Sequence, residues 1–293
     1  MPELRRPTAM ASLPGGRVEY RLERRGGSVV VVFHGGHVRA GLALGEEVFA
    51  DAGYGVLVPS RPGYGRTPLS TGSSVVGFTD VVRALCADLG ISRIAAVVGI
   101  SGGGPTAVTM AARHRDLVDR VILISAVGWL PWPDLITRVG AHGMFTAATE
   151  SVTWAGVRLL ARVAPETCLR LLLRNLSNRP AGQVVARLSP DNRALLLTLF
   201  ATMRSGRGFL RDLRPTPDFT ADVHQPTLVI ATRNDRGVPF AHSESLADAI
   251  THAELVESQA DSHFVWLAPD WPVIAERIRV FLDTDWRVSS ETG

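Results

Sequence analysis

The chain has 293 residues, of which 46% are hydrophobic and 20% charged, so it is long and apolar enough to bury one large core. Its formal net charge is +3, and its 31 basic residues are spread along the chain rather than gathered into the patch that nucleic-acid binding needs. All of them are arginine, and the lack of lysine excludes a Schiff base, a Ser-Lys dyad and a Walker-type phosphate loop.

The amino-terminal residues and the cysteines narrow the class of protein further. The first sixteen residues lack the apolar region of a signal peptide, and we expect them to form a loose tail. No apolar stretch approaches the length of a membrane span. Cys86 and Cys168 are too isolated for a disulfide framework or a CxxC metal site, and both are predicted to be buried. We therefore expect a cytoplasmic protein with a small-molecule substrate and no nucleic-acid or membrane partner; a homodimer is left open.

The first 126 residues alternate short apolar runs with helical patterns. An early hairpin or edge strand is predicted over 16–27, and buried strands over 28–36, 54–65, 93–100 and 120–126. Helices are predicted over 40–52, 75–90 and 103–114. This alternation predicts an α/β fold, with a mostly parallel central sheet flanked by helices and joined by right-handed crossovers.

The periodicity changes after residue 126. Five successive helical patterns and no convincing strand lie between 127 and 222, and this stretch holds 12 arginines against 7 acidic residues. The alternation then returns, with strands predicted over 225–235 and 253–259 and helices over 243–250 and 270–284. We therefore predict a core made of 1–126 and 223–293, with a helical lid inserted over 127–222.

One serine stands between an apolar run and three glycines in "VVGISGGGPT", residues 97–106. A phosphate cradle would need a different glycine spacing, and a plain strand-to-helix turn is the simplest alternative. The order Gly99-x-Ser101-x-Gly103 between a strand and a helix instead fits a nucleophile elbow, whose sharp turn requires small residues two before and two after the serine. Gly104 is expected to permit close packing of the helix.

A serine nucleophile needs a base, and the base needs an orienting carboxylate. His263 follows the last predicted strand, at the edge of the sheet that Ser101 also occupies. Asp235 follows another strand, whereas Asp261, only two residues from His263, is the less favourable acid. The remaining histidines considered for this role are expected in loops or on solvated helix faces: His142, His224, His242 and His252.

The order Ser101, Asp235, His263, with an insertion between the nucleophile and the acid, resembles the α/β-hydrolase fold family over nearly the whole chain. The segments that carry the resemblance are "HGG" (34–36), "SRPGYGRT" (60–67), "TRNDRGVP" (232–239) and "DSHF" (261–264). Ser60 stands where that family usually has aspartate. The resemblance implies an oxyanion hole formed by the N–H groups of Gly36 and Gly102.

In that family, the insertion covers the nucleophile and shapes the substrate site. We expect some aromatic side chains to line an apolar pocket, although most of them should only join helices; the candidates are His37, Trp129, Trp132 and Phe264. The excess of arginine in the insertion would suit an anionic substrate group, but a solvated helix face explains it as well. His34 and His37 are a weak candidate for a metal pair, and we expect neither a metal nor a cofactor.

The resemblance implies a serine hydrolase that cleaves a small, largely apolar carboxylic ester or lactone through an acyl-enzyme. A serine rather than an aspartate at the elbow disfavours epoxide hydrolase and haloalkane dehalogenase chemistry. Two alternatives are open. In the first, the same triad acts on an amide or C–C bond, or in acyl transfer or perhydrolysis. In the second, the protein binds a ligand and keeps the scaffold without turnover.

Overall fold

A computed structural model describes residues 4–133, 135–146 and 148–284. Its centre is one eight-stranded sheet with strand order β1-β2-β4-β3-β5-β6-β7-β8. The strands are β1 (Ala9–Leu13), β2 (Gly16–Glu23), β3 (Val29–Phe33), β4 (Gly55–Pro59), β5 (Ile94–Ile100), β6 (Val121–Ile124), β7 (Thr227–Ala231) and β8 (Ala253–Glu257). Strand β2 pairs antiparallel with β1 and β4, and every pairing from β4 to β8 is parallel, which confirms the predicted class.

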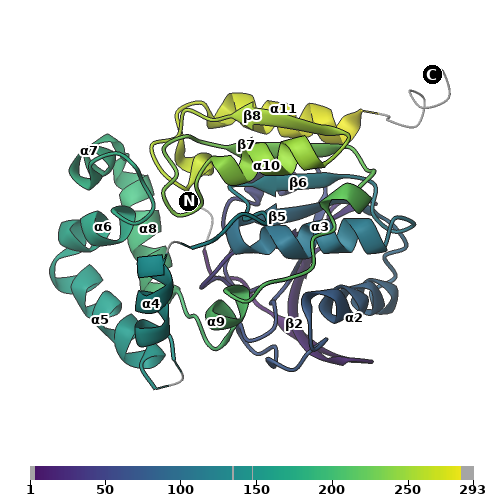
Figure 1. Cartoon of the computed structure of the whole chain (residues 1–293), viewed down its shortest axis with the longest axis horizontal. Helices are drawn as coiled ribbons and strands as arrows, with labels where there is room; N and C mark the ends of the chain where they lie inside the picture. Colours follow the sequence, from purple (N-terminus) through teal and green to yellow (C-terminus); the bar gives the residue numbers. More distant parts are fainter. Residues whose placement is uncertain (1–3, 134, 147, 285–293) are drawn as a thin grey trace.

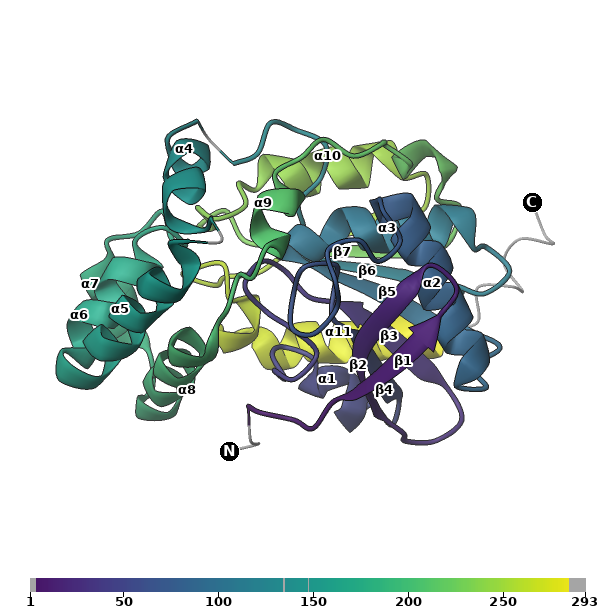
Figure 2. The same ribbon diagram turned by 90° about the horizontal axis from the view of Figure 1, so that it is seen from below.

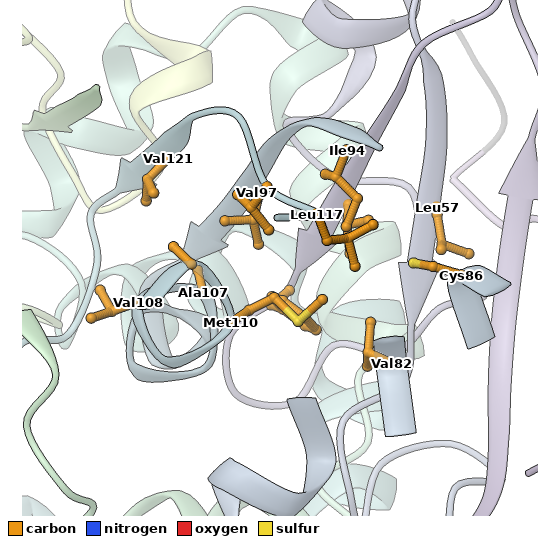
Figure 3. Close-up of a cluster of buried hydrophobic side chains, with 14 of the residues drawn as sticks. Leu57, Val82, Cys86, Ile94, Val97, Ala107, Val108, Met110, Leu117 and Val121 are labelled. Carbon is orange, nitrogen blue, oxygen red and sulfur yellow. The ribbon is translucent and has the colours of Figure 1, made fainter. Parts of the chain in front are cut away.

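Helices cover both faces of the sheet (Figure 2). Helices α2 (Val75–Asp88), α3 (Gly104–Arg113) and α10 (Ala241–Ala249) lie on one face, and α1 (Glu47–Asp51) and α11 (Trp271–Asp283) on the other. Successive residues of a strand point to opposite faces, so Val31 and Phe33 join the core under α2 and α3, whereas Val30 and Val32 join the core under α11. Figure 3 shows the first of these cores, where Met110 of α3 and Cys86 of α2 meet strand residues. The two cysteines are buried, as predicted.

Residues 127–222, called here the helical segment, form helices at one end of the sheet (Figure 1). They are α4 (Leu135–Met144), α5 (Glu150–Val163), α6 (Pro165–Leu173), α7 (Ala181–Arg187), α8 (Pro190–Thr202) and α9 (Gly208–Asp212), followed by a single 3₁₀ turn, η2 (Thr220–Asp222). Helices α5, α6, α7 and α8 share a separate apolar cluster that includes Trp154, Leu173 and Phe200. This cluster also includes Leu42, Leu44 and Phe264 from outside the segment, so it joins the helical segment to the rest of the molecule.

Three local predictions were wrong. Residues 9–13 are not part of a loose tail but form edge strand β1, because the turn at Pro14–Gly16 folds them back onto β2. Residues 40–46 are not helical: Leu42 and Ala43 instead donate backbone hydrogen bonds to Arg39 and Leu4, and helix α1 begins only at Glu47. His242 is not solvated but buried, and its Nδ1 accepts a hydrogen bond of 3.1 Å from the Gly128 N–H.

No helix in the described ranges is long and apolar enough to cross a membrane.

Candidate active site

The serine turn joins the end of β5 to α3. Ser101 has a φ angle of 53°, which lies in the left-handed region that residues with a side chain rarely adopt. A Cβ on Gly99 would lie 2.8 Å from the Gly104 Cα, and a Cβ on Gly103 would overlap the carbonyl oxygen of Phe33. A Cβ on Gly104 would lie 2.5 Å from the carbonyl oxygen of Val127, which is the close packing predicted for that glycine. Sterically, the turn therefore requires glycine at positions 99, 103 and 104.

The histidine and the acid lie on neighbouring loops. Asp235 follows β7, and His263 lies between β8 and a short turn, η3 (Val265–Leu267). The His263 Nδ1 and the Asp235 Oδ2 are 2.6 Å apart, and both residues are buried. The other carboxylate oxygen of Asp235 accepts a hydrogen bond of 2.9 Å from the Val238 N–H. This pairing fixes the ring through Nδ1 and leaves Nε2 as the nitrogen that can exchange a proton with a reactant.

The loop after β6 contacts both Ser101 and His263. The Val127 N–H donates a hydrogen bond of 2.9 Å to the Ser101 carbonyl, and the Ser125 hydroxyl donates one of 3.2 Å to the His263 carbonyl. These contacts hold the two loops at the same edge of the sheet. Within the described residues, the Ser101 hydroxyl has no hydrogen-bond partner; catalytic hydrogen bonds often shorten only when substrate binds.

The glycine loop after β3 passes directly beside Ser101. A Cβ on Gly35 would lie 2.6 Å from the Ser101 Cβ and 3.0 Å from its Oγ. The Gly36 nitrogen lies 3.6 Å from the position that a Cβ on Gly102 would take. The structure therefore brings the backbone of Gly35 and Gly36 close to Ser101 and Gly102, and the oxyanion hole stays a prediction.

A buried ion pair that the sequence did not predict joins the loop after β4 to the helical segment. Arg61 binds both carboxylate oxygens of Asp212, at 2.6 and 2.7 Å, and its Nε donates a hydrogen bond of 2.7 Å to the His34 carbonyl. The Tyr64 hydroxyl donates to Asp212 at 2.6 Å. Burial opposes the charge of Arg61, but the Asp212 carboxylate outweighs it and raises the arginine pKa above its ordinary value. Only the "SRPGYGRT" segment, which holds Arg61 and Tyr64, could have indicated this site.

A second set of contacts, also missed, holds the acid and the histidine from the helical segment. The His263 N–H donates to the Leu176 carbonyl at 2.9 Å. The Asn178 N–H donates to the Asn234 carbonyl at 2.8 Å, and the Asn178 side chain donates to the Asp235 carbonyl at 3.1 Å. Residues 176–178 follow α6, and no motif in the sequence marks them.

A cavity of about 270 Å³ adjoins the serine turn. Gly102, Trp129 and Trp132 line it, whereas Ser101 and His263 do not. Trp132 also donates a hydrogen bond of 2.7 Å to the carbonyl of Gly237, two residues after Asp235. The two tryptophans thus line a cavity next to the serine turn, and their contact with substrate stays a prediction.

The other two predicted pocket residues lie elsewhere. His37 packs among Phe145, Trp154 and Phe209 of the helical segment, with its Nδ1 2.7 Å from the Ser205 hydroxyl. Burial first, and then the charge of Arg61, lower the pKa of His37 to about 3. Phe264 packs against Phe200 and Trp266. Neither side chain lines the cavity beside Gly102, and a role for them in a substrate pocket stays a prediction.

The competing acid and the candidate metal pair have other partners. Asp261 binds Arg179 and Arg187 at 2.8 and 3.0 Å. His34 lies 3.0 Å from the Glu46 carboxylate, which also binds Arg21, while His37 faces the aromatic side chains described above. In the ranges that the structure describes, no group of three or more His, Cys, Asp or Glu residues could hold a metal ion.

Comparison with known proteins places this geometry in a family. A profile described as alpha/beta hydrolase fold matches residues 29–269. The uncharacterized hydrolase YcgS of Bacillus subtilis is 27% identical over 273 residues, which cover 91% of this chain and 95% of that protein. The 2-hydroxy-6-oxo-6-phenylhexa-2,4-dienoate hydrolase of Comamonas testosteroni is 32% identical, with coverage of 83% and 84%.

The solved structure of an alpha/beta hydrolase fold protein from Nakamurella multipartita superposes with a TM-score of 0.78. It is 24% identical and covers 94% of this chain and 99% of its own, so this likeness concerns the fold. The match to the family profile extends over most of the chain and includes the serine turn, the acid loop and the histidine loop. The protein belongs to the α/β-hydrolase fold family.

Proposed function

We propose that this protein is a serine hydrolase that cleaves a small, largely apolar carboxylic ester or lactone through an acyl-enzyme. The observation that carries the proposal is the 2.6 Å hydrogen bond between His263 and Asp235, located at the same sheet edge as the strained Ser101 turn. Membership in a family of hydrolases supports the general class of reaction.

In the proposed reaction, His263 Nε2 takes the hydroxyl proton as the Ser101 Oγ attacks the carbonyl carbon. The tetrahedral intermediate collapses, the ester C–O bond breaks, and the leaving alkoxide receives the proton from His263. A water molecule, deprotonated by the same nitrogen, then releases the acid and restores the serine. Asp235 holds the ring tautomer and stabilises the imidazolium that forms in both steps.

The N–H groups of Gly36 and Gly102 are the proposed donors to the oxyanion. Their closeness to Ser101 supports this role, because donors fixed before the reaction need no reorganisation as charge develops. Each such donor is worth roughly 2.7–4 kcal/mol of transition-state stabilisation.

Ser101→Ala tests the proposal with 4-nitrophenyl esters of short acyl chains. We expect kcat to fall by a factor on the order of 10⁴–10⁶, whereas Ser70→Ala, an exposed serine, should retain full activity. A fluorophosphonate probe should label the wild type and not Ser101→Ala. Full activity in folded Ser101→Ala would refute the proposal, and an unlabelled, inactive wild type would favour a binding protein.

A second candidate function is cleavage of a carbon–carbon bond by the same residues. It is favoured by the similarity to the Comamonas testosteroni hydrolase, whose named substrate is a ketone without an ester group. Hydrolysis of such a compound must break a C–C bond. Parallel assays with a vinylogous 1,5-diketone and a 4-nitrophenyl ester, analysed by product, would separate the two functions.

A further inference from the structure

The cavity beside Gly102 has a strongly basic wall. Arg138 of α4, Arg211 of α9 and Arg214 just after α9 line it, together with Arg61 from the loop after β4. Asp212 is the acidic residue among the described lining residues. Among the described lining residues, four guanidinium groups and one carboxylate therefore surround a small space.

The Asp212 carboxylate of this wall already has hydrogen-bond partners. Both of its oxygens bind Arg61, and one also accepts the Tyr64 hydroxyl. Among the described residues, none of Arg138, Arg211 and Arg214 has an acidic group within ion-pair distance. The cavity wall thus carries three positive charges that no described side chain neutralises.

Two of these arginines are held by backbone carbonyls. Arg138 donates a hydrogen bond of 2.9 Å to the Trp132 carbonyl, and Arg211 donates to the Leu69 carbonyl. Within the described part of the chain, Arg138 Nε and Arg211 Nη2 are buried and have no hydrogen-bond partner. Burial lowers the pKa of Arg211, and the charges of Arg214 and Arg61 lower it further against the opposing effect of Asp212. These cations are fixed in place while lacking the counter-charge that partly buried cations normally have.

Exposure distinguishes Arg138 and Arg211 from several other arginines of the helical segment, although Arg214 is exposed and Arg158, Arg179, Arg193 and Arg204 are also half-buried. Arg162, Arg170 and Arg174 are exposed, as expected for a solvated helix face, whereas Arg138 and Arg211 are half-buried. A solvated face therefore explains the first set and not the second.

The cavity also indicates what kind of anion it suits. A guanidinium group matches the geometry of a carboxylate through paired N–H donors. The rest of the lining is largely apolar, including Val127, Leu130 and Leu213. A volume of about 270 Å³ fits a short carbon chain rather than a large ring system.

The cavity meets the reaction site at Gly102. The position of a Cβ on that glycine would lie 3.5 Å from Asp212 Oδ2, 3.6 Å from an Arg61 nitrogen and 3.6 Å from the Gly36 nitrogen. A ligand that fills the cavity therefore ends beside the two N–H groups proposed to bind the oxyanion.

We propose that this cavity binds a carboxylate on the acyl part of the substrate, so that the protein acts on esters or lactones of short dicarboxylic acids. Arg138, Arg211 and Arg214 bind the free carboxylate, and the scissile carbonyl lies at Ser101. The inference rests on the proposed function for the reaction that follows binding, but binding itself does not require turnover.

Binding is tested first in Ser101→Ala, by calorimetric titration with glutarate and with its uncharged diamide. We expect glutarate to bind at least about tenfold more tightly than the diamide, since only the acid offers charge-assisted hydrogen bonds. Adding Arg211→Gln should weaken glutarate binding by about 10- to 100-fold. Adding Arg174→Gln, which removes the same charge from an exposed position, should leave it unchanged.

Turnover is tested in the wild type with mono-4-nitrophenyl glutarate and 4-nitrophenyl pentanoate, after subtraction of spontaneous hydrolysis. Arg211→Gln should lower kcat/KM for the glutarate ester by a similar factor and leave that for the pentanoate ester within about twofold. Preserved pentanoate activity also shows that the variant folds. Should it not fold, Arg214→Gln, with an exposed side chain, takes its place.

Equal binding of acid and diamide, or equal effects of Arg211→Gln and Arg174→Gln, would overturn the inference. Failure of the proposed function would give a different result. In that case, Ser101→Ala would keep its esterase activity, whatever the glutarate titrations show.

Discussion

The sheet core and the helical segment contribute to the site in different ways. Ser101, Asp235 and His263 all follow strands of the parallel part of the sheet, β5, β7 and β8, so backbone pairing sets where they meet. The helical segment supplies none of these three groups. It supplies part of the wall of the cavity and contacts to the core that include those of residues 176–178 and of Asp212. The proposed reacting groups therefore belong to the core alone, whereas the cavity beside them is lined by both parts of the chain.

Replacing the acid should have the largest effect, because it acts within the core alone. Asp235→Asn keeps the shape of the side chain but no longer holds the histidine in the correct tautomer, and we expect kcat to fall on the order of 10⁴-fold. Asp261→Asn is the matched control, since Asp261 binds arginines rather than His263, and it should stay within about twofold. Equal losses in both variants would show that the acid has been assigned wrongly.

The next largest effect should come from the ion pair that joins the two regions. Asp212→Asn leaves the buried Arg61 without its counter-charge, and we expect the free energy of unfolding to fall by about 3–5 kcal/mol. Glu166→Gln removes an exposed partner of Arg170 within the helical segment and should cost about 0.5 kcal/mol or less. Urea unfolding measures both; a small loss in Asp212→Asn would mean that the two regions are joined mainly elsewhere.

Residues 176–178 should have a smaller effect, on turnover rather than on stability. Asn178→Ala removes the side-chain hydrogen bond to the Asp235 carbonyl, and we expect kcat to fall about 3- to 10-fold with KM nearly unchanged. The pH at which activity is half-maximal should shift as well, because Asn178 acts by positioning the partner of His263. Asn175→Ala, an exposed residue on the same turn, is the control. A change confined to KM would argue against a positioning role.

An effect of similar size concerns His37, where the two regions meet. Its pKa is lowered to about 3 in the folded protein against 6.5 in the unfolded chain, so only the unfolded chain takes up this proton between those values. Its contribution to stability is therefore complete above pH 6.5 and is lost as the pH falls toward 3. Between pH 7 and pH 5, we expect a loss of about 1–2 kcal/mol from this group.

His37→Asn, which keeps a polar group near Ser205 and tolerates a positive φ, should show a correspondingly weaker dependence of unfolding free energy on pH. Parallel pH curves for the wild type and the variant would contradict the assignment.

The sequence predicted most of the core and little of the contact between the regions, for a physical reason. Strand-to-helix turns such as Gly99–Gly103 and the strand ends before Asp235 and His263 are determined locally, so their residues leave a readable pattern. The pair Arg61–Asp212 spans 151 positions, and each member alone resembles an ordinary surface charge. His37 shows the same limit: its position after "HGG" gave no sign of the packing against Phe145, Trp154 and Phe209, which come from distant parts of the chain.

Ser60 shows how a departure from a family pattern can be compensated. Its hydroxyl donates a hydrogen bond of 2.8 Å to Glu19 of β2, and it accepts one of 2.9 Å from the Ala40 N–H. Glu19 also accepts from Arg66 and Thr8. A carboxylate is thus present beside this loop, provided by an adjacent strand, and no pattern within the segment itself could have revealed it.

The hydrogen bonds of residues 176–178 limit how this molecule can open and close. Lifting the whole helical segment from the sheet would break the bonds to the His263 N–H and the Asp235 carbonyl, and would loosen the base and its acid together. A motion that admits a ligand without loosening His263 and Asp235 must pivot about residues 176–178. Because α9 ends at Asp212, movement of the far side of the segment would also have to break the buried Arg61–Asp212 pair, and this pair therefore opposes such a motion.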